Sequence, residues 1–188
     1  MKSSGWGLAW GAAGLLAIAT TARAEAGQRM EVKRVSVRVE NYGTTPLQVR
    51  VLAQLMASRI FASIGVKIEW RPRADARNVI EVRLRRDTPE EFLPGALGYA
   101  NPFEISAPRV YVLYDRVLAT NARSRLGYVL GHVIAHELAH AIERSDGHAR
   151  EGVLKARWAP RDLAQMEIEP LGFTDSDAAL IRAGVSAY

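Results

Sequence analysis

The most constraining feature of this sequence is a long helical pattern over residues 126–144 that carries polar groups along one side. Four apolar residues recur at helical spacing and form a stripe: Leu130, Ile134, Leu138 and Ile142. His136 and His140 are four residues apart on roughly the opposite side, about one helical turn from each other. The pattern predicts a helix that packs one face into a core and presents both imidazoles on the other.

The residues between the two histidines complete a His-Glu-x-x-His pattern, which reads His136-Glu137-Leu138-Ala139-His140. Neutral imidazoles suit a zinc ion that keeps an open coordination position. A glutamate beside that position is the natural general base, because it can take a proton from an attacking water and return it to a leaving amine. We therefore predict one catalytic Zn²⁺ held by His136 and His140, with Glu137 as the catalytic residue. The chain contains no cysteine, which excludes thiolate ligands.

The third metal ligand is predicted to be His148, which follows the helix end expected at Asp146 and Gly147. Imidazole is the commoner zinc ligand, and a turning chain could bring this histidine back to the metal. Asp146 is an alternative, since carboxylates also bind zinc. Glu143 is a third candidate, for which a solvated side chain is the simpler interpretation.

A further histidine, His132, lies one turn before His136. Helical twist rotates it away from the side of His140, so three helical histidines cannot all face one ion. We expect a packed or supporting role for it. For a second oxyanion donor the sequence offers Tyr128 and Arg157 without distinguishing between them.

The N-terminal residues have the composition of a secretory signal. Lys2 precedes an apolar run at 6–19, and Ala22-Arg23-Ala24 has the small-x-small pattern of a cleavage site. The run is short and rich in Gly and Ala for a membrane span, with an uncleaved anchor as the alternative. We expect a signal peptide over residues 1–24 and a secreted or periplasmic mature chain without stable membrane insertion.

The remaining residues, 25–188, suit a single domain with a sizeable core, so no disulfide framework is needed. The formal net charge of the whole chain is +5 at pH 7. Because its arginines are scattered rather than grouped with aromatic residues, we expect no nucleic-acid partner. The oligomeric state is left open.

Periodicity predicts an α+β fold. The expected elements are a strand at 30–39, a helix at 47–64, strands at 66–70 and 79–84, a loop at 88–108, a strand at 110–113, the histidine helix and a last helix that Asp175 or Ser176 caps and that runs to Ile181. We expect Arg83 and Arg85 on a solvent-facing side of their strand. A loop as long as 88–108 usually has a task such as lining a site.

In this layout the chain resembles a metzincin, most closely the matrixin-type catalytic domain. The loop at 94–102 resembles the matrixin segment Leu-Ala-His-Ala followed by proline, and residues 148–158 are similar to the His…Gly-Ile-Met-x-Ala-x-Trp segment of small exported bacterial proteins. The resemblance implies a twisted mixed sheet of about four strands packed on the long N-terminal helix and the His-Glu-x-x-His helix, with a C-terminal helix. It also implies that the strand at 110–113 is a sheet edge to which an extended peptide adds.

The chain departs from the family pattern at five positions, of which the smallest change is Ala139 in place of a glycine just before the second histidine. Glu143 stands where the metzincin helix normally ends at a glycine, so we expect the helix to run about one turn longer, 3.6 residues. His148 comes two residues later than the family's third histidine, and Leu154 stands where a methionine lies beneath the metal. Tyr99 replaces a loop histidine that helps to hold a structural zinc, so we expect no second zinc.

These features favour an exported zinc-dependent peptidase that hydrolyses peptide bonds in a peptide or protein substrate. One alternative is a non-catalytic exported metal-binding module on the same fold. Another is a metal hydrolase of a non-peptide amide, such as a cell-wall bond. The intact Glu137 argues for catalysis, because a purely structural metal needs no base.

Overall fold

Five strands form one sheet in the part of the chain that this computed structural model describes, residues 32–41, 45–70, 72, 78–88, 94–101, 108–120 and 123–186. They are β1 (Lys33–Asn41), β2 (Val66–Glu69), β3 (Val79–Arg85), β4 (Gly98–Ala100) and β5 (Arg109–Leu113). Their spatial order is β2-β1-β3-β5-β4. β4 is antiparallel to β5, whereas the other neighbouring strands are parallel. The fold is therefore a mixture of helices with a mostly parallel sheet.

All described residues fall within one unit, Glu31–Tyr188. The expected signal peptide over residues 1–24 and the expected strand start at Met30 lie outside the described residues. Within the described ranges, none of the helices combines the length and the apolar character that a membrane span requires.

The fifth strand, β4, lies in the segment that was expected to be a loop. Its residues pair with β5 in register, with Tyr99 opposite Tyr111. β5 therefore lies between β3 and β4, and the expectation that residues 110–113 form a sheet edge is wrong. A strand of three residues that begins with glycine is too short to show alternation, which is why the sequence did not reveal it.

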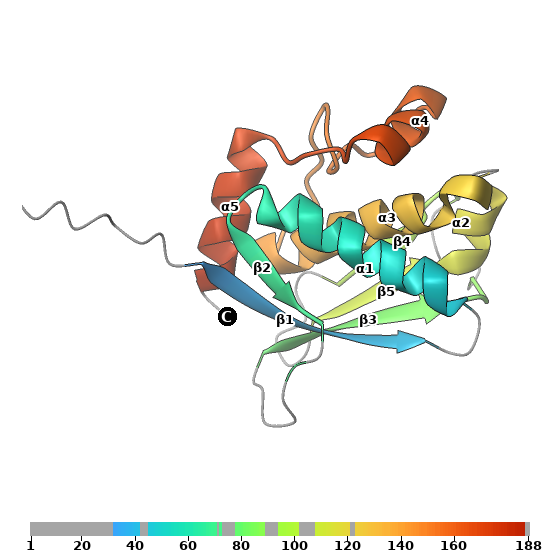
Figure 1. Ribbon diagram of the computed structural model, residues 1–188. Helices are drawn as coiled ribbons and strands as arrows, with labels where there is room; N and C mark the ends of the chain where they lie inside the picture. Colours follow the sequence, from blue (N-terminus) through green and yellow to red (C-terminus); the bar gives the residue numbers. More distant parts are fainter. Residues whose placement is uncertain are drawn as a thin grey trace, which may run out of the picture. The chain divides into compact units, whose positions relative to one another are not determined.

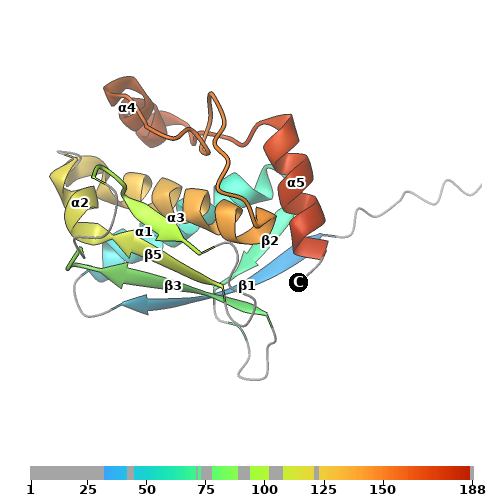
Figure 2. The ribbon, with the colours of Figure 1, turned by 180° about the vertical axis from the view of Figure 1, so that it is seen from behind.

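Five α-helices occur in the described residues: α1 (Leu47–Ala62), α2 (Tyr114–Ala119), α3 (Leu126–Glu143), α4 (Pro160–Ile168) and α5 (Asp175–Ser186). A short 3-10 helix, Arg123–Arg125, precedes α3. α1 and α3 lie side by side over the same face of the sheet, and α5 packs beside the start of β1 (Figures 1 and 2). α1, α3 and α5 match predicted helices. α2 and α4 have 6 and 9 residues and were not predicted.

The end of α5 and its cap differ from the prediction. Thr174, rather than Asp175 or Ser176, caps this helix, and the helix runs to Ser186. The backbone N–H of Thr174 donates to Asp177 Oδ2 at 3.0 Å, and the N–H of Asp177 donates to Thr174 Oγ1 at 3.2 Å. This reciprocal pair is a capping box, which satisfies backbone donors that a helix start leaves free.

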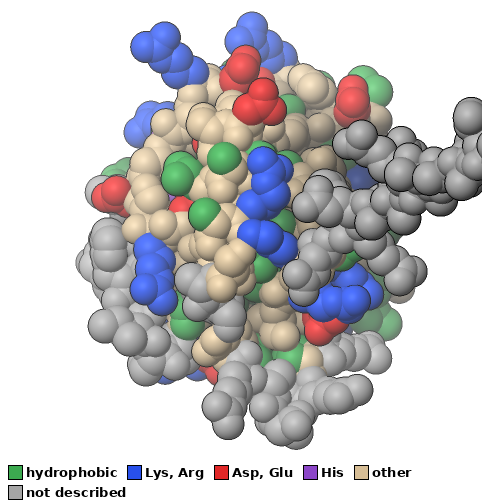
Figure 3. Space-filling model, turned by 90° about the vertical axis from the view of Figure 1, so that its left-hand side faces the viewer, with side chains coloured by type: hydrophobic (Ala, Val, Ile, Leu, Met, Phe, Trp, Pro, Cys, Tyr) green, Lys and Arg blue, Asp and Glu red, His purple; other side chains and the backbone are tan. Residues whose placement is uncertain are grey.

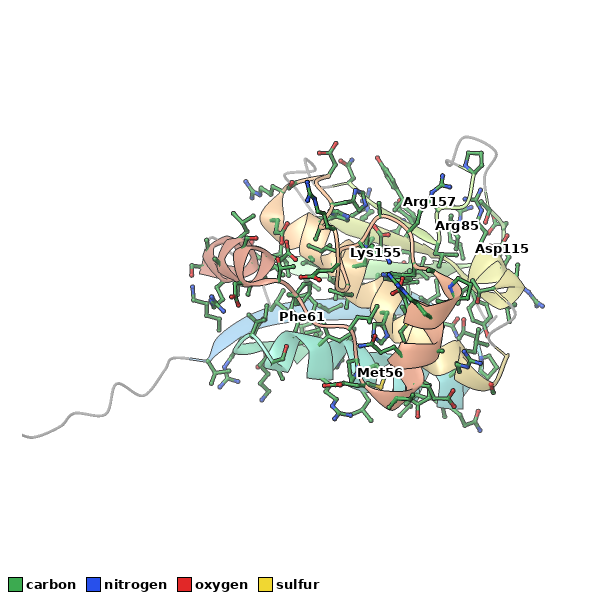
Figure 4. The ribbon with its side chains drawn as sticks, turned by 90° about the horizontal axis from the view of Figure 1, so that it is seen from above. Met56, Phe61, Arg85, Asp115, Lys155 and Arg157 are labelled. Atoms are coloured by element: carbon green, nitrogen blue, oxygen red, sulfur yellow. The ribbon has the colours of Figure 1, made fainter. Side chains whose placement is uncertain are left out.

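The contact between α1 and α3 depends on two glycines of α3. A methyl group added at Gly127 would lie 2.7 Å from Leu52 Cδ2. At Gly131 it would lie 2.6 Å from Met56 Cβ and 2.7 Å from the carbonyl oxygen of Ala53. The absence of side chains here lets the two backbones approach closely. Figure 4 labels Met56 and Phe61 on α1.

The two faces of the sheet differ in polarity. Alternate residues of the central strands are buried beneath the helices: Val35, Val37, Ile80, Val82, Leu84, Val110 and Val112. Arg83 and Arg85 alternate with them on the other face, as predicted, and pair with acidic side chains. On the face shown in Figure 3, basic and acidic side chains are interspersed rather than gathered into one basic patch.

Candidate metal centre

The histidine helix α3 is buried on nearly all sides rather than on one face. From Val129 to Ile142 every residue is buried, including His136 (9% exposed), Glu137 (7%) and His140 (6%). The helix ends at Glu143, and Arg144 adopts a left-handed conformation with φ 53° and ψ 45°. The break is therefore at Arg144 rather than at Asp146-Gly147. The expected extra turn is also absent, because the helix ends at the position of the family's glycine.

The structure brings His136, His140 and His148 together. One ligand nitrogen from each of these three residues lies within 4.8 Å of the other two. His148 reaches the pair from the turn after α3, and its ring centroid is 5.3 Å from that of His136 and 4.9 Å from that of His140. His136 and His140 are buried, whereas His148 is exposed. Asp146 is not part of this group.

Backbone carbonyls fix the tautomers of the two helical histidines. The Nδ1–H of His136 donates to the carbonyl oxygen of Val153 at 2.8 Å. The Nδ1–H of His140 donates to the carbonyl oxygen of Ser145, also at 2.8 Å. Because a carbonyl oxygen can only accept, Nδ1 carries the proton and Nε2 keeps a lone pair in each neutral ring.

These two lone pairs face each other. The Nε2 atoms of His136 and His140 are 3.0 Å apart, although neither has a proton to share when both rings are neutral. Two nitrogens bound to one tetrahedral zinc at about 2.0–2.1 Å would lie about 3.3 Å apart. A cation between the two atoms turns a repulsive contact into a pair of bonds. The three histidines therefore fit a metal ion.

Burial keeps these imidazoles neutral. It lowers the pKa of His136 to about 3, with the positive charge of His140 as the next cause. The pKa of His140 is also lowered, with burial as the largest cause and the charge of His148 as the second. Metal binding requires neutral imidazole, so both rings are in the binding form at neutral pH.

A tight turn lies beneath His136. The N–H of Ala149 donates to the carbonyl oxygen of Leu154 at 2.9 Å. The N–H of Val153 donates to the carbonyl oxygen of Gly172, also at 2.9 Å. Leu154 is 1% exposed. Leu154 is therefore buried within this turn, and the carbonyl of the preceding residue, Val153, orients His136.

Glu137 lies against β4. Burial raises the pKa of its carboxyl group to about 8, although the backbone N–H of Ala100 donates a hydrogen bond to this group and thereby favours the ionised form. A methyl group added at Gly98 would lie 2.7 Å from both Cγ and Oε1 of Glu137. The prediction that the segment 88–108 lines the site is thus met by β4, which contacts the candidate base.

His132 has a supporting position, as predicted. It is fully buried, its Nδ1–H donates to the carbonyl oxygen of Tyr128 at 2.8 Å, and its Nε2 accepts the N–H of Leu171 at 3.0 Å. Both ring nitrogens are therefore used within the protein. Burial lowers the pKa of His132 to about 4.

The other candidates do not join the metal group. Glu143 is half-buried and not the solvated side chain that was expected: its Oε1 is buried with no hydrogen-bond partner among the described residues. Burial raises its pKa to about 7, with the charge of Asp177 as the second cause. Within the described ranges no hydrogen bond or ion pair joins the side chains of Tyr128 or Arg157 to the three histidines. Figure 4 labels Arg157, which is exposed on the segment before α4.

Several partners of the site could not be found from the sequence. The carbonyls of Val153 and Ser145 and the N–H of Ala100 belong to the backbone, so no residue type marks them. Trp158, whose ring lies beside His136, had only its place in a family-like segment as a signal.

Comparison of the chain with protein-family models and with curated proteins gives no match.

Proposed function

We propose that this protein is an exported zinc-dependent peptidase of metzincin type. The observation that carries the proposal is the 3.0 Å approach of the two Nε2 lone pairs of His136 and His140, with His148 beside them. This arrangement provides three imidazole nitrogen ligands and leaves a position for a reacting group, as in catalytic rather than structural zinc sites.

The residues around the metal position have separate tasks in this proposal. Zinc, when bound, would polarise the scissile carbonyl and lower the pKa of a reacting water. Glu137 is the base that takes the proton from this water and passes it to the leaving amine. The N–H of Ala100 orients its carboxylate, and a divalent cation nearby would favour the ionised form of that carboxylate. Val153 and Ser145 hold the two imidazoles in the ligating tautomer.

Metzincin character is supported by the layout rather than by sequence matches. The helix with His136 and His140, the turn with His148, the turn with the buried Leu154 and the final helix follow each other in the expected order. Since β5 is interior, the strand at the edge beside Glu137 is β4. We place an extended peptide substrate along β4, where backbone hydrogen bonds would add it to the sheet.

The test combines metal content with proteolysis. Purified protein should bind one zinc per chain and cleave an unfolded protein substrate, and a chelator should abolish the cleavage. Glu137→Gln should retain zinc but lose cleavage by at least about 100-fold, the lower range for a general base. Glu151→Gln is the matched control, because Glu151 is an exposed glutamate. Undiminished cleavage by Glu137→Gln would falsify the mechanism.

The same experiment separates the two alternatives. Zinc binding without turnover on broad peptide libraries would indicate a non-catalytic binding module. Cleavage of peptidoglycan fragments but not of peptides would indicate a hydrolase of a non-peptide amide. Export is tested by N-terminal sequencing of the protein recovered outside the cytoplasm, which should begin at Glu25.

A further inference from the structure

Trp158 contacts two histidines of α3 at once. Its indole plane is nearly perpendicular to both imidazoles, at 87° and a centroid distance of 5.7 Å for His136, and at 85° and 6.3 Å for His132. Edge-to-face arrangements of this kind are favourable between aromatic rings. Trp158 therefore borders the metal ligand His136 on the side that leads toward His132.

The polar group of this indole has no partner. Trp158 Nε1 is buried and makes no hydrogen bond within the described part of the chain. By contrast, Trp70 Nε1 donates to Ser58 Oγ at 2.7 Å. An unpaired buried donor destabilises the folded state. Ring packing against the imidazoles, rather than a hydrogen bond, is thus the interaction that the position of Trp158 provides.

A short network fixes the backbone around Trp158. Asp162 of α4 accepts the N–H of Ala159 at 2.7 Å and the Nζ of Lys155 at 2.6 Å. Lys155 lies two residues after Val153, whose carbonyl binds His136 Nδ1. The segment 153–162 therefore touches His136 at its start through Val153 and further along through Trp158. The Lys155–Asp162 ion pair closes the loop that carries Trp158.

These contacts restrain different motions of one imidazole. The Val153 carbonyl sets the direction of Nδ1, and the indole blocks tilting of the ring toward His132. Together they leave Nε2 directed at Nε2 of His140.

We propose that Trp158 is a positioning residue for the metal ligand His136, held in place by the Lys155–Asp162 pair. The inference rests on the zinc site of the proposed function but not on peptidase activity. A side chain in this role sets the affinity for the metal and its rate of release without touching the metal or the substrate.

The test measures zinc affinity in the full chain by competition with a fluorescent chelator. Trp158→Leu should weaken zinc binding by about 10-fold or more, as is typical for partners that orient a ligand histidine. Trp158→Phe keeps one ring and should weaken it less, and Asp162→Asn should shift it in the same direction. Zinc release into excess chelator should be faster in all three variants. The Co²⁺ absorption spectrum should change in Trp158→Leu, because the geometry around His136 changes.

Trp70→Phe is the matched control. It removes an indole whose N–H is bonded to Ser58, so it should lower the melting temperature while the zinc affinity stays within about twofold of native. A folded Trp158→Leu with native zinc affinity and a native Co²⁺ spectrum would overturn the proposal. If that variant does not fold, Trp158→Phe decides, and an unchanged rate of zinc release would reject the role. A native protein that binds no zinc would instead reject the proposed function.

Discussion

His132 and Leu171 are joined by a hydrogen bond of 3.0 Å from the backbone N–H of Leu171 to Nε2 of the imidazole. The bond ties α3 to the segment that precedes α5. Since Nδ1 of the same ring donates to Tyr128, His132 is held as a neutral tautomer with both nitrogens satisfied. Protonation of Nε2 would remove the acceptor and leave a buried charge.

The pKa of His132 therefore predicts a loss of stability in acid. In metal-free protein this histidine stays neutral down to pH about 4, whereas in the unfolded chain it takes up a proton below about 6.5. The unfolded state binds more protons in this window, so stability falls as the pH falls from 6.5 through 4. His132→Gln should lack this component, on the order of 3 kcal/mol at most. Denaturant unfolding at several pH values in the presence of a chelator measures the difference, and equal slopes for both proteins would refute it.

Substitutions of His148 and of Asp146 should differ in their effects on zinc binding. His148→Ala should weaken zinc binding by more than the 10- to 100-fold that loss of an outer partner causes, because a ligand itself is removed. Asp146→Asn should leave the affinity within a few-fold, since Asp146 lies outside the group of ligand nitrogens. Chelator competition on both variants tests this, and the reverse ranking would make Asp146 the third ligand.

The raised pKa of Glu143 predicts that stability depends on pH in the opposite direction. Its folded pKa of about 7 lies above the ordinary value of 4.5, so the folded state holds the proton longer than the unfolded state. Stability is then lost as the pH rises from 4.5 to 7. Glu143→Gln should have about the native stability near pH 4.5 and should be more stable than native at pH 8. The gain should be about 1–2 kcal/mol, because solvent screens this half-buried group. The measurement is the unfolding free energy at both pH values, with Glu151→Gln as a surface control.

The close approach of α1 and α3 predicts the effect of a single methyl group. Gly131→Ala should destabilise the protein by about 1–3 kcal/mol through overlap with Met56 Cβ and the Ala53 carbonyl, although alanine is the better helix former. Gly172→Ala is the control, because nothing lies within 4 Å of the added carbon. Thermal unfolding of both variants measures the two effects. A Gly131→Ala protein as stable as native would mean that α1 can shift without cost.

Local patterns in the sequence predicted the elements that depend on side-chain spacing. The four-residue interval of His136 and His140 and the apolar stripe of α3 gave that helix. Alternating or strongly apolar segments gave β1, β2, β3 and β5. They could not predict that α3 is buried all around, because this depends on what α1, the sheet and α4 place against it. They also placed the helix break at Asp146-Gly147 rather than at Arg144, since arginine is an uncommon residue in the left-handed conformation that Arg144 adopts.

The parts of the site that escaped prediction are those made by backbone atoms or by tertiary packing. Ala100 contributes an N–H to Glu137, and any residue but proline would offer the same group. Trp158 acts through its place beside His136, which only the path of the chain after α3 determines. His148 was predicted because its residue type is a ligand in its own right, independent of the turn that carries it.

The unequal exposure of the three histidines implies an order of assembly for the metal site. His136 and His140 acquire their positions when α3 docks into the core, whereas His148 stands on an exposed turn outside it. The core would thus supply a ready-made bidentate pair as soon as the chain folds, and the exposed turn would add the third imidazole, which stands beside that pair. The turn that follows the helix, rather than the core, would then govern how fast the metal is captured and released.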